Sequence, residues 1–188
     1  MARPIEYNQE QVLDKVMETF WLKGYEGTSV SDLVDATSLN TRTMYNLYGD
    51  KNGLFRAALD NYHDKIMGDF FTTLKQNEGL KGIRMIFDWV AENEMMNGCL
   101  FANTLSECNV IDKDCLGFVK DAFGKVEAQF AENLTQARKA GEFNGDLKAT
   151  SKLLLLIMQG MSVFSKTRPT KTERKKMIDS ALTILSAN

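Results

Sequence analysis

The stretch from Thr28 to Phe55 reads TSVSDLVDATSLNTRTMYNLYGDKNGLF and carries two sets of helix-capping residues in close succession. Ser29 and Asp32 have the spacing of a capping box, which opens a helix of about two turns. After a short turn, Asn40 can cap a second helix, and Gly49 is the residue type that ends one. Two short helices joined by a tight turn and followed by a longer helix predict a helix-turn-helix DNA-binding domain.

Longer helical patterns lie on both sides of this stretch. Asn8 is a candidate N-cap for a helix whose apolar stripe stops at Gly24 and Gly27, and another helical pattern runs from Asp50 to Gly79. Breaks further along divide the rest of the chain into five helices, at about 80–96, 99–109, 112–140, 146–166 and 170–186. The sequence therefore predicts an all-α protein of about nine helices.

The composition is that of a soluble globular protein. The chain has 188 residues, of which 44% are hydrophobic and 26% charged, and its two prolines, Pro4 and Pro169, lie near expected segment ends. The apolar run from Leu153 to Met158 is far too short to span a bilayer, and the N-terminal residues do not resemble a signal peptide. We therefore expect a cytoplasmic protein without membrane contact.

Catalytic and metal-binding motifs are missing from the sequence. Cys99, Cys108 and Cys115 are odd in number and form no C-x-x-C pair, which argues against a disulfide framework and against a structural zinc site. His63 is the only histidine, and no H-E-x-x-H, G-x-S-x-G, G-x-G-x-x-G or phosphate-loop motif is present. We expect no enzyme activity, no catalytic residues, no cofactor and no metal.

Charge limits how the N-terminal part can bind DNA. Residues 1–60 contain six Lys and Arg against nine Asp and Glu, a net charge of −3. A few positioned side chains must then make the contacts, rather than a broad positive surface. Non-specific affinity should be modest and should fall steeply with salt.

The spacing of residues across the first 60 positions resembles a known family. The residues that carry the resemblance are Thr28, Leu33, Val34, Ala36, Leu39, Asn40, Thr43, Met44, Tyr45, Tyr48, Lys51 and Leu54. Over about residues 8–60 this pattern is similar to the N-terminal domain of the TetR family of bacterial transcriptional regulators. The resemblance implies a DNA-binding domain at residues 1–50 and, at 51–188, a domain that binds a small ligand and forms a homodimer.

The resemblance also implies which side chains meet DNA. Thr28, Tyr45 and Lys51 would hold phosphates, and the residues nearest the bases would be Ser31, Thr41, Arg42, Thr43 and Asn46. The full predicted set is Thr28, Ser29, Ser31, Asn40, Thr41, Arg42, Thr43, Tyr45, Asn46, Tyr48 and Lys51. Arg42 is the one long cation on the recognition helix, and its guanidinium suits the O6 and N7 atoms of guanine. Taken singly, such tyrosines are more often half-buried core residues than phosphate ligands, and such an arginine is more often a solvated surface charge. Their joint spacing with Thr28, Leu39 and Lys51 is what favours DNA binding.

Two positions depart from the family pattern. Members usually carry glycine where this chain has Ser38, so the turn must accept a side chain, with a strained dihedral as one outcome. Leu47 replaces a residue that is often polar or histidine, and we expect Met44 and Leu47 to point back into the domain. The base preference of relatives therefore cannot be transferred to this chain.

The second half of the chain is rich in Met, Phe and Leu, which suit an adaptable apolar cavity but also an ordinary core. The resemblance favours the cavity. The candidate ligand-pocket residues are Phe87, Met95, Cys99, Leu100, Asn103, Phe118, Phe123, Met158 and Met161. A ligand there would act on the recognition helix through a shift of the long helix that begins after Asp50.

The last two helices are candidates for the dimer interface. Apolar residues extend over Leu153–Phe164 and Met177–Leu185, more than one monomer needs to cover. Between them, a basic cluster at 166–176 is expected to be a solvated face. The predicted partners are thus a double-stranded DNA operator, an unidentified small-molecule inducer and a second copy of the chain.

Alternative functions remain open at this point. Cys99 falls near a helix start, where the helix dipole lowers a thiol pKa, so a thiol-based sensor regulator is one alternative to a plain buried cysteine. A helical interaction module without DNA binding is another. We favour a repressor over an activator, because release by a ligand needs only a conformational misfit.

Overall fold

The computed structural model describes residues 8–68, 70–72, 77–93 and 96–185 of the chain. Its N-terminal part begins with three helices, Gln9–Gly27 (α1), Val30–Thr37 (α2) and Thr41–Tyr48 (α3). Asn8 caps α1, and Ser29 and Asp32 form the capping box of α2. The side-chain oxygen of Asn40 accepts a hydrogen bond from the Thr43 amide at 2.9 Å at the start of α3. The helix starts predicted from the sequence are confirmed.

The turn between α2 and α3 contains a left-handed residue. Ser38 has a φ of 61°, a region that glycine adopts freely and other residues only with strain. Leu39 follows and is only 2% exposed, so it fixes the turn against the core. The strained dihedral named as one outcome at Ser38 is confirmed.

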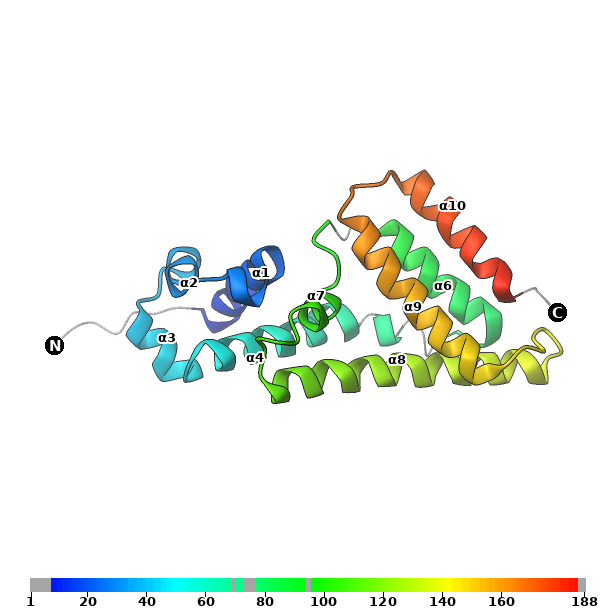
Figure 1. Cartoon of the computed structure of the whole chain (residues 1–188), viewed down its shortest axis with the longest axis horizontal. Coiled ribbons are helices and arrows are strands. Elements are labelled where there is room, and N and C mark those ends of the chain that lie inside the picture. The colour runs from blue at the N-terminus through cyan, green and yellow to red at the C-terminus, as the bar shows by residue number, and fades with distance from the viewer. Residues whose placement is uncertain (1–7, 69, 73–76, 94–95, 186–188) are drawn as a thin grey trace.

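A long helix leads from the N-terminal helices into the rest of the molecule (Figure 1). It begins as Lys51–Tyr62 (α4), with Asp50 as its N-cap, and continues in a π-helical turn at His63–Met67. Helical residues follow at 68 and 70–72. The sequence predicts one continuous helical pattern from Asp50 to Gly79, and its apolar spacing does not reveal the π turn.

Five further helices complete the described part of the chain. They are Gly79–Glu92 (α6), Leu100–Ser106 (α7), Lys113–Lys139 (α8), Leu147–Ser165 (α9) and Lys171–Leu182 (α10), with a 3₁₀ turn at Thr183–Leu185. Within the described ranges the chain thus has nine α-helices of seven residues or more, which confirms the all-α prediction. Two helices are shorter than expected: α7, because Cys99 is its N-cap and Glu107 already ends it, and α10, which gives way to the 3₁₀ turn after Leu182.

The helices are arranged along one long axis (Figure 1). α4 and α8 run along it, with α1, α2 and α3 at one end and α6, α9 and α10 at the other, while α7 lies between the two ends. Phe20 of α1 packs edge-on against Phe55 of α4, and Tyr62 at the end of α4 packs against Phe101 of α7 at 5.0 Å between ring centroids. One continuous core therefore connects the two ends.

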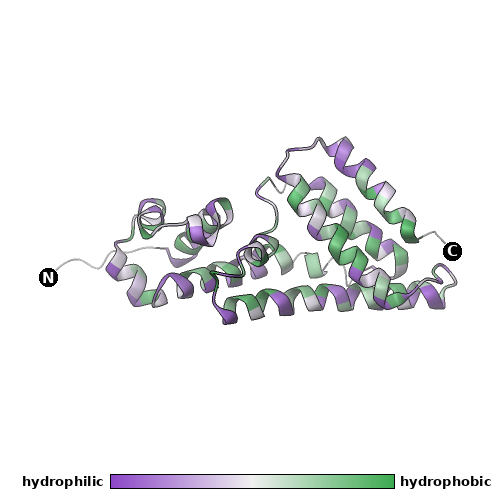
Figure 2. Ribbon diagram, viewed as in Figure 1, coloured by the Kyte–Doolittle hydropathy of each residue, from purple (hydrophilic) through white to green (hydrophobic). Residues whose placement is uncertain are grey.

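α9 carries more apolar surface than this core covers. Figure 2 shows it as hydrophobic along much of its length. By length and composition alone α9 could cross a membrane, although core helices of soluble proteins pass the same test. Leu153, Leu156 and Val163 are 42%, 62% and 57% exposed on its outer side, whereas Leu154 and Met161 are buried on the inner side. The outer side of α9 is thus an apolar face without a cover in the monomer.

Candidate nucleic-acid interface

The recognition helix α3 presents one polar face to solvent. Thr41, Arg42 and Asn46 are exposed on it, and Met44 is fully buried on the other side. Leu47 is 41% exposed, so the prediction that it points into the domain is wrong. The core-facing position one helical turn after Met44 is Tyr48, so Leu47 lies on the outer face of the helix. Sequence reasoning therefore missed an apolar side chain in the predicted DNA-contacting surface.

The other predicted contacts surround this helix at different depths. Ser31 is exposed, whereas Thr43, Tyr45 and Tyr48 are half-buried, with both tyrosine rings against the core. Ser29 and Asn40 are exposed but already serve as helix caps. The hydroxyl of Ser29 donates to the Asp32 carboxylate at 2.8 Å.

Thr28 is not placed as a phosphate ligand in this structure. It is 1% exposed, and its hydroxyl donates to the Gly24 carbonyl at 2.6 Å. A phosphate needs a donor, and the Thr28 proton is committed to the backbone. Its visible role is to tie the end of α1 to the start of α2.

Lys51 lies at the first position of α4, beside the end of α3. Its Nζ atom is 4.5 Å from the centre of the Tyr25 ring, a cation–π contact that holds the ammonium group near the helix N-terminus. The Tyr25 hydroxyl in turn donates to the Asn52 side chain. A positioned cation beside a helix N-terminus suits a phosphate, although the Asp50 side chain already accepts a hydrogen bond from the Gly53 amide there at 2.9 Å.

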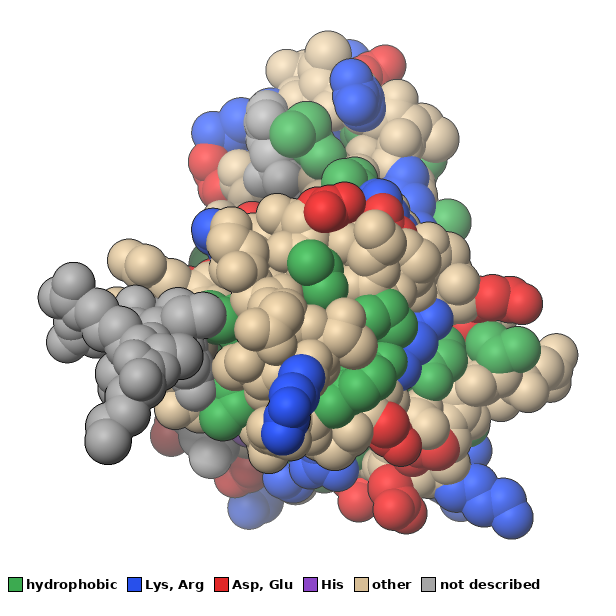
Figure 3. Space-filling view, turned by 90° about the vertical axis from the view of Figure 1, so that its left-hand side faces the viewer, with side chains coloured by type: hydrophobic (Ala, Val, Ile, Leu, Met, Phe, Trp, Pro, Cys, Tyr) green, Lys and Arg blue, Asp and Glu red, His purple; other side chains and the backbone are tan. Residues whose placement is uncertain are grey.

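Charge on this end of the molecule is mixed. Figure 3 views it along the long axis and shows Lys and Arg side chains scattered among uncharged and acidic ones. Part of the cation set is also neutralised, because Lys23 lies 2.5 Å from the Asp32 carboxylate. Hydrogen bonds from Lys23 and then Ser29 hold the pKa of Asp32 well below its usual range, so it stays ionised. This end of the molecule is therefore not a broad positive surface.

Sequence comparison identifies what this arrangement belongs to. The family model described as bacterial regulatory proteins, tetR family, matches residues 12–58, which span α1 to α4. The model described as tetracyclin repressor-like, C-terminal domain, matches residues 81–180. The chain belongs to the TetR family of bacterial transcriptional regulators. The first match confirms the resemblance predicted over about residues 8–60, and the second extends it to the C-terminal part. The prediction that the protein is not an enzyme agrees with the family.

Individual TetR-family proteins match most of the chain. The HTH-type transcriptional repressor ComR of Escherichia coli (strain K12) is 30% identical over 170 residues, covering 86% of this chain and 81% of ComR. An uncharacterized regulator of Bacillus subtilis (strain 168), YezE, is 25% identical over 193 residues, covering 98% of this chain and all of YezE. A cysteine mutant of CifR complexed with 26-bp operator DNA has the same fold, with a TM-score of 0.83 at 20% identity over 97% of this chain and 98% of CifR.

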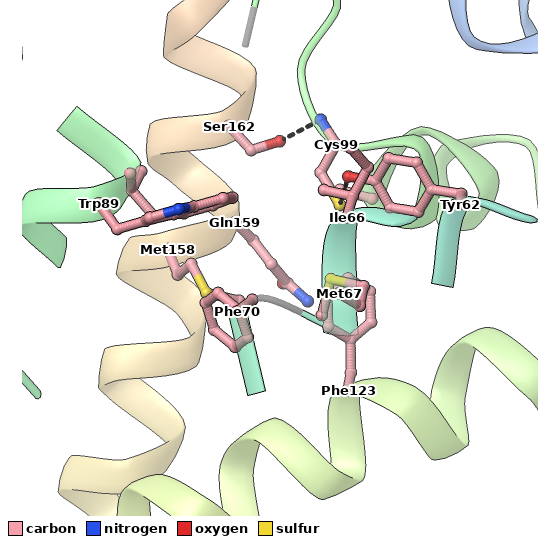
Figure 4. Close-up of a pocket in the computed structure, with 12 residues that line it drawn as sticks. Tyr62, Ile66, Met67, Phe70, Trp89, Cys99, Phe123, Met158, Gln159 and Ser162 are labelled. Atoms are coloured by element: carbon pink, nitrogen blue, oxygen red, sulfur yellow. Dashed lines mark hydrogen bonds between the residues drawn. The ribbon is translucent and has the colours of Figure 1, made fainter. Parts of the chain in front are cut away.

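A cavity lies where α4, α6, α7, α8 and α9 meet (Figure 4). It is lined by Tyr62, Ile66, Met67, Phe70, Trp89, Val90, Cys99, Ala102, Phe123, Met158, Gln159 and Ser162. The cavity volume is about 30 Å³. The cavity is therefore almost filled by its own side chains, and a ligand would have to push its flexible methionines aside.

The predicted pocket residues divide into two groups. Cys99, Phe123 and Met158 line the cavity, whereas Met95 lies outside the described residues. The others do not line this cavity, namely Phe87, Leu100, Asn103, Phe118 and Met161. Phe87, Leu100 and Met161 are buried in the core. The Asn103 side chain donates a hydrogen bond to the Asn97 carbonyl, and the Phe118 ring packs against the Arg56 guanidinium. Helical spacing alone could not separate a core face from a cavity wall.

Cys99 differs from its expected state. It is the N-cap of α7, and its amide donates to the Ser162 hydroxyl at 2.9 Å. Burial raises the pKa of the Cys99 thiol, and hydrogen bonds from Tyr62 and from backbone amides offset only part of that effect. The prediction of a lowered thiol pKa is therefore wrong, because desolvation outweighs the helix terminus.

Proposed function

We propose that this protein is a homodimeric transcriptional repressor that binds a palindromic operator through α3 and is released by a small ligand. The observation that carries the proposal is the outer face of α3, where Thr41, Arg42, Asn46 and Leu47 are free to meet a major groove. Lys51 at the start of α4 would fix the helix to the phosphate backbone. Such a protein acts on DNA in the cytoplasm. Its relative ComR is itself described as a repressor, and CifR is complexed with operator DNA.

The outer face of α9 supports the homodimer. Leu153, Leu156, Gly160 and Val163 follow each other at intervals of three, four and three residues, the spacing of a helix–helix seam. A side chain at Gly160 would meet nothing within 4 Å in the monomer, so a second helix could approach closely there. Met177 on α10 is 41% exposed and would extend the interface. Two copies of α9 and α10, the helices that the sequence makes candidates for the interface, would form a four-helix bundle.

The cavity supports a small and uncharged inducer. Among the described residues none of its lining side chains is charged at neutral pH, and its walls are aromatic rings and methionines. The carboxamide of Gln159 points into it and is the polar group best placed to orient a ligand (Figure 4). Opening the cavity would displace the π turn of the linking helix and so alter the distance between the two recognition helices. Repression is favoured because a misfit of this kind is enough to release DNA.

Selection from a random duplex library tests the function. Wild type should enrich a palindrome. Arg42→Ala should enrich it less or with a weaker base preference, since one bidentate guanine contact is worth about 1–3 kcal/mol of discrimination. Lys120→Ala, which removes an exposed cation from α8, is the matched control and should enrich the same sequence. A folded dimer that enriches nothing at low salt would instead be a ligand-binding or interaction protein.

A further inference from the structure

The last turn of α1 is held by a residue from the other half of the protein. Gly24 interrupts α1 with φ 77° and ψ 174°, values outside the helical region. Directly after this kink, the carboxylate of Glu107 accepts hydrogen bonds from the amide of Tyr25 at 3.1 Å and from that of Glu26 at 2.8 Å. Glu107 is the C-cap residue of α7, more than 80 residues further along the chain.

The kink explains why this carboxylate is needed. Amides that follow a helix break lose the carbonyl partners four residues earlier, and a carboxylate is a strong replacement acceptor. The site also requires glycine for two reasons. The φ of Gly24 is positive, and a Cβ atom there would lie 2.4 Å from the Glu107 Oε1 atom. Gly24 and Glu107 therefore form one matched site.

A second contact joins the other end of α7 to the same helix. The indole N–H of Trp21 donates to the Gly98 carbonyl at 3.0 Å, just before α7 begins. The segment from Gly98 to Glu107 is thus bound at both ends to residues 21–26 of α1. We expect α7 and the end of α1 to move together.

The residues held by Glu107 support the proposed phosphate contacts. The Lys51 ammonium group lies over the Tyr25 ring, and the Tyr25 hydroxyl donates a hydrogen bond to the Asn52 side chain. The Gly24 carbonyl accepts a hydrogen bond from the Thr28 hydroxyl. These contacts set where α2 and α4 begin, on either side of the recognition helix. On the cavity side, α7 contributes Ala102 to the wall. One short helix therefore touches both the cavity and the base of the DNA-binding surface.

We propose that Glu107 is a positioning residue that transmits a change in the cavity to the DNA-contacting helices. Filling the cavity displaces α7, and the Glu107 carboxylate carries that displacement to Tyr25, Lys51 and thereby α3. This route acts beside any shift of α4. The proposal rests on the proposed function, since it needs the chain to bind an operator.

A double-mutant cycle tests this coupling without knowledge of the inducer. Ala102→Leu adds bulk to the cavity wall on α7 and mimics a ligand, and Glu107→Ala removes the carboxylate. Affinity for the selected operator is measured by fluorescence anisotropy for wild type, both single variants and the double variant. Glu18→Ala, which removes an exposed carboxylate from α1, is the control for the loss of negative charge near DNA. Melting temperature and circular dichroism establish that each variant is folded.

We expect Ala102→Leu to lower operator affinity about tenfold in wild type and less than about twofold in Glu107→Ala, a typical size for coupling between sites. Glu107→Gln keeps one acceptor oxygen and should give an intermediate result, and it replaces Glu107→Ala if that variant does not fold. Equal losses in both backgrounds, or no loss from Ala102→Leu in folded protein, would overturn the role of Glu107. Failure of the wild type to bind any duplex would instead overturn the proposed function.

Discussion

The hydroxyl of Tyr62 donates a hydrogen bond to the Sγ atom of Cys99 at 3.4 Å, between the end of α4 and the start of α7. Burial raises the pKa of both groups, so the pair is a neutral contact at physiological pH. The ring of Trp21 packs edge-on against Tyr62 at 5.0 Å between centroids. Together these contacts join α1, α4 and the start of α7 beside the cavity. A ligand that moved Tyr62 or Cys99 would therefore affect all three helices.

Cysteine reactivity should follow burial. We expect iodoacetamide at neutral pH to alkylate the exposed Cys108 first, because the thiolate reacts and the pKa of the Cys99 thiol is raised. Cys115 should react last, since burial and then Asp112 raise its pKa to about 12. Peptide mass spectrometry over time measures the order. Faster labelling of Cys99 than of Cys108 would contradict this account and support the thiol-sensor alternative.

Replacing glycine by alanine should have opposite effects on stability at the kink in α1 and at an ordinary helix position. Gly24→Ala should destabilise the protein by about 1–3 kcal/mol, because it combines a strained φ with a clash against Glu107. The control is Gly124→Ala in α8, where the new Cβ meets nothing within 4 Å. That change should stabilise the protein by about 0.5–1 kcal/mol through helix propensity. Urea unfolding measures both, and equal effects would contradict the assigned role of Gly24.

Leu47 is an exposed apolar side chain on the recognition helix, and we expect it to contact the C5-methyl group of a thymine in the major groove. Replacing operator thymines singly by deoxyuridine removes only that methyl group. We expect wild type to lose affinity several-fold at one thymine of each half-site and Leu47→Ala to be insensitive there. If both proteins respond alike at every thymine, Leu47 does not face the bases.

The α9 face should control oligomeric state. Leu156→Glu places a charge at the most exposed position of the seam and should convert the dimer to a monomer that binds the palindrome far more weakly. Val110→Glu changes a residue that is 45% exposed away from the seam and should remain dimeric. Light scattering gives the molar masses. A dimeric Leu156→Glu, or a monomeric wild type, would remove α9 as the interface.

The link between α6 and α10 should weaken in acid. Hydrogen bonds from Lys171 and then Lys175 lower the pKa of Glu92 to about 2 from its usual 4.5. A lowered pKa in the folded state stabilises the protein above the unfolded value, so this contribution is complete above about pH 4.5 and is lost toward pH 2. Thermal unfolding of wild type and Glu92→Gln should therefore differ at neutral pH and converge as the pH falls through this window. A constant difference would contradict the ion pair.

Features encoded by neighbouring residues could be predicted from the sequence. The caps at Ser29, Asn40 and Asp50 act within three residues, and the strain at Ser38 is expected because family members usually carry glycine at that position. The cavity could not be predicted in the same way. Its walls come from five helices, and whether Phe87 or Trp89 faces it depends on how α6 is rotated against its neighbours.

The junction between the two halves was also beyond sequence reasoning. The sequence predicts a helix end at Gly24 and not a kink, because the partner Glu107 is more than 80 residues away along the chain. Thr28 is predicted to contact phosphate on the family resemblance alone, and that pattern does not reveal the bond of its hydroxyl to the Gly24 carbonyl, only four residues earlier. Contacts made in the folded chain, at short and at long range, decide which polar side chains remain free for a ligand.

The ratio of affinities for the selected palindrome and for a scrambled duplex of equal composition tests the central claim most directly. Anisotropy titrations at several salt concentrations provide it for wild type and Arg42→Ala. The account predicts a wild-type ratio of about 10³ or more while both affinities fall with salt, and a clearly smaller ratio for Arg42→Ala. A ratio near one for the wild type at every salt concentration would contradict sequence-specific binding through α3.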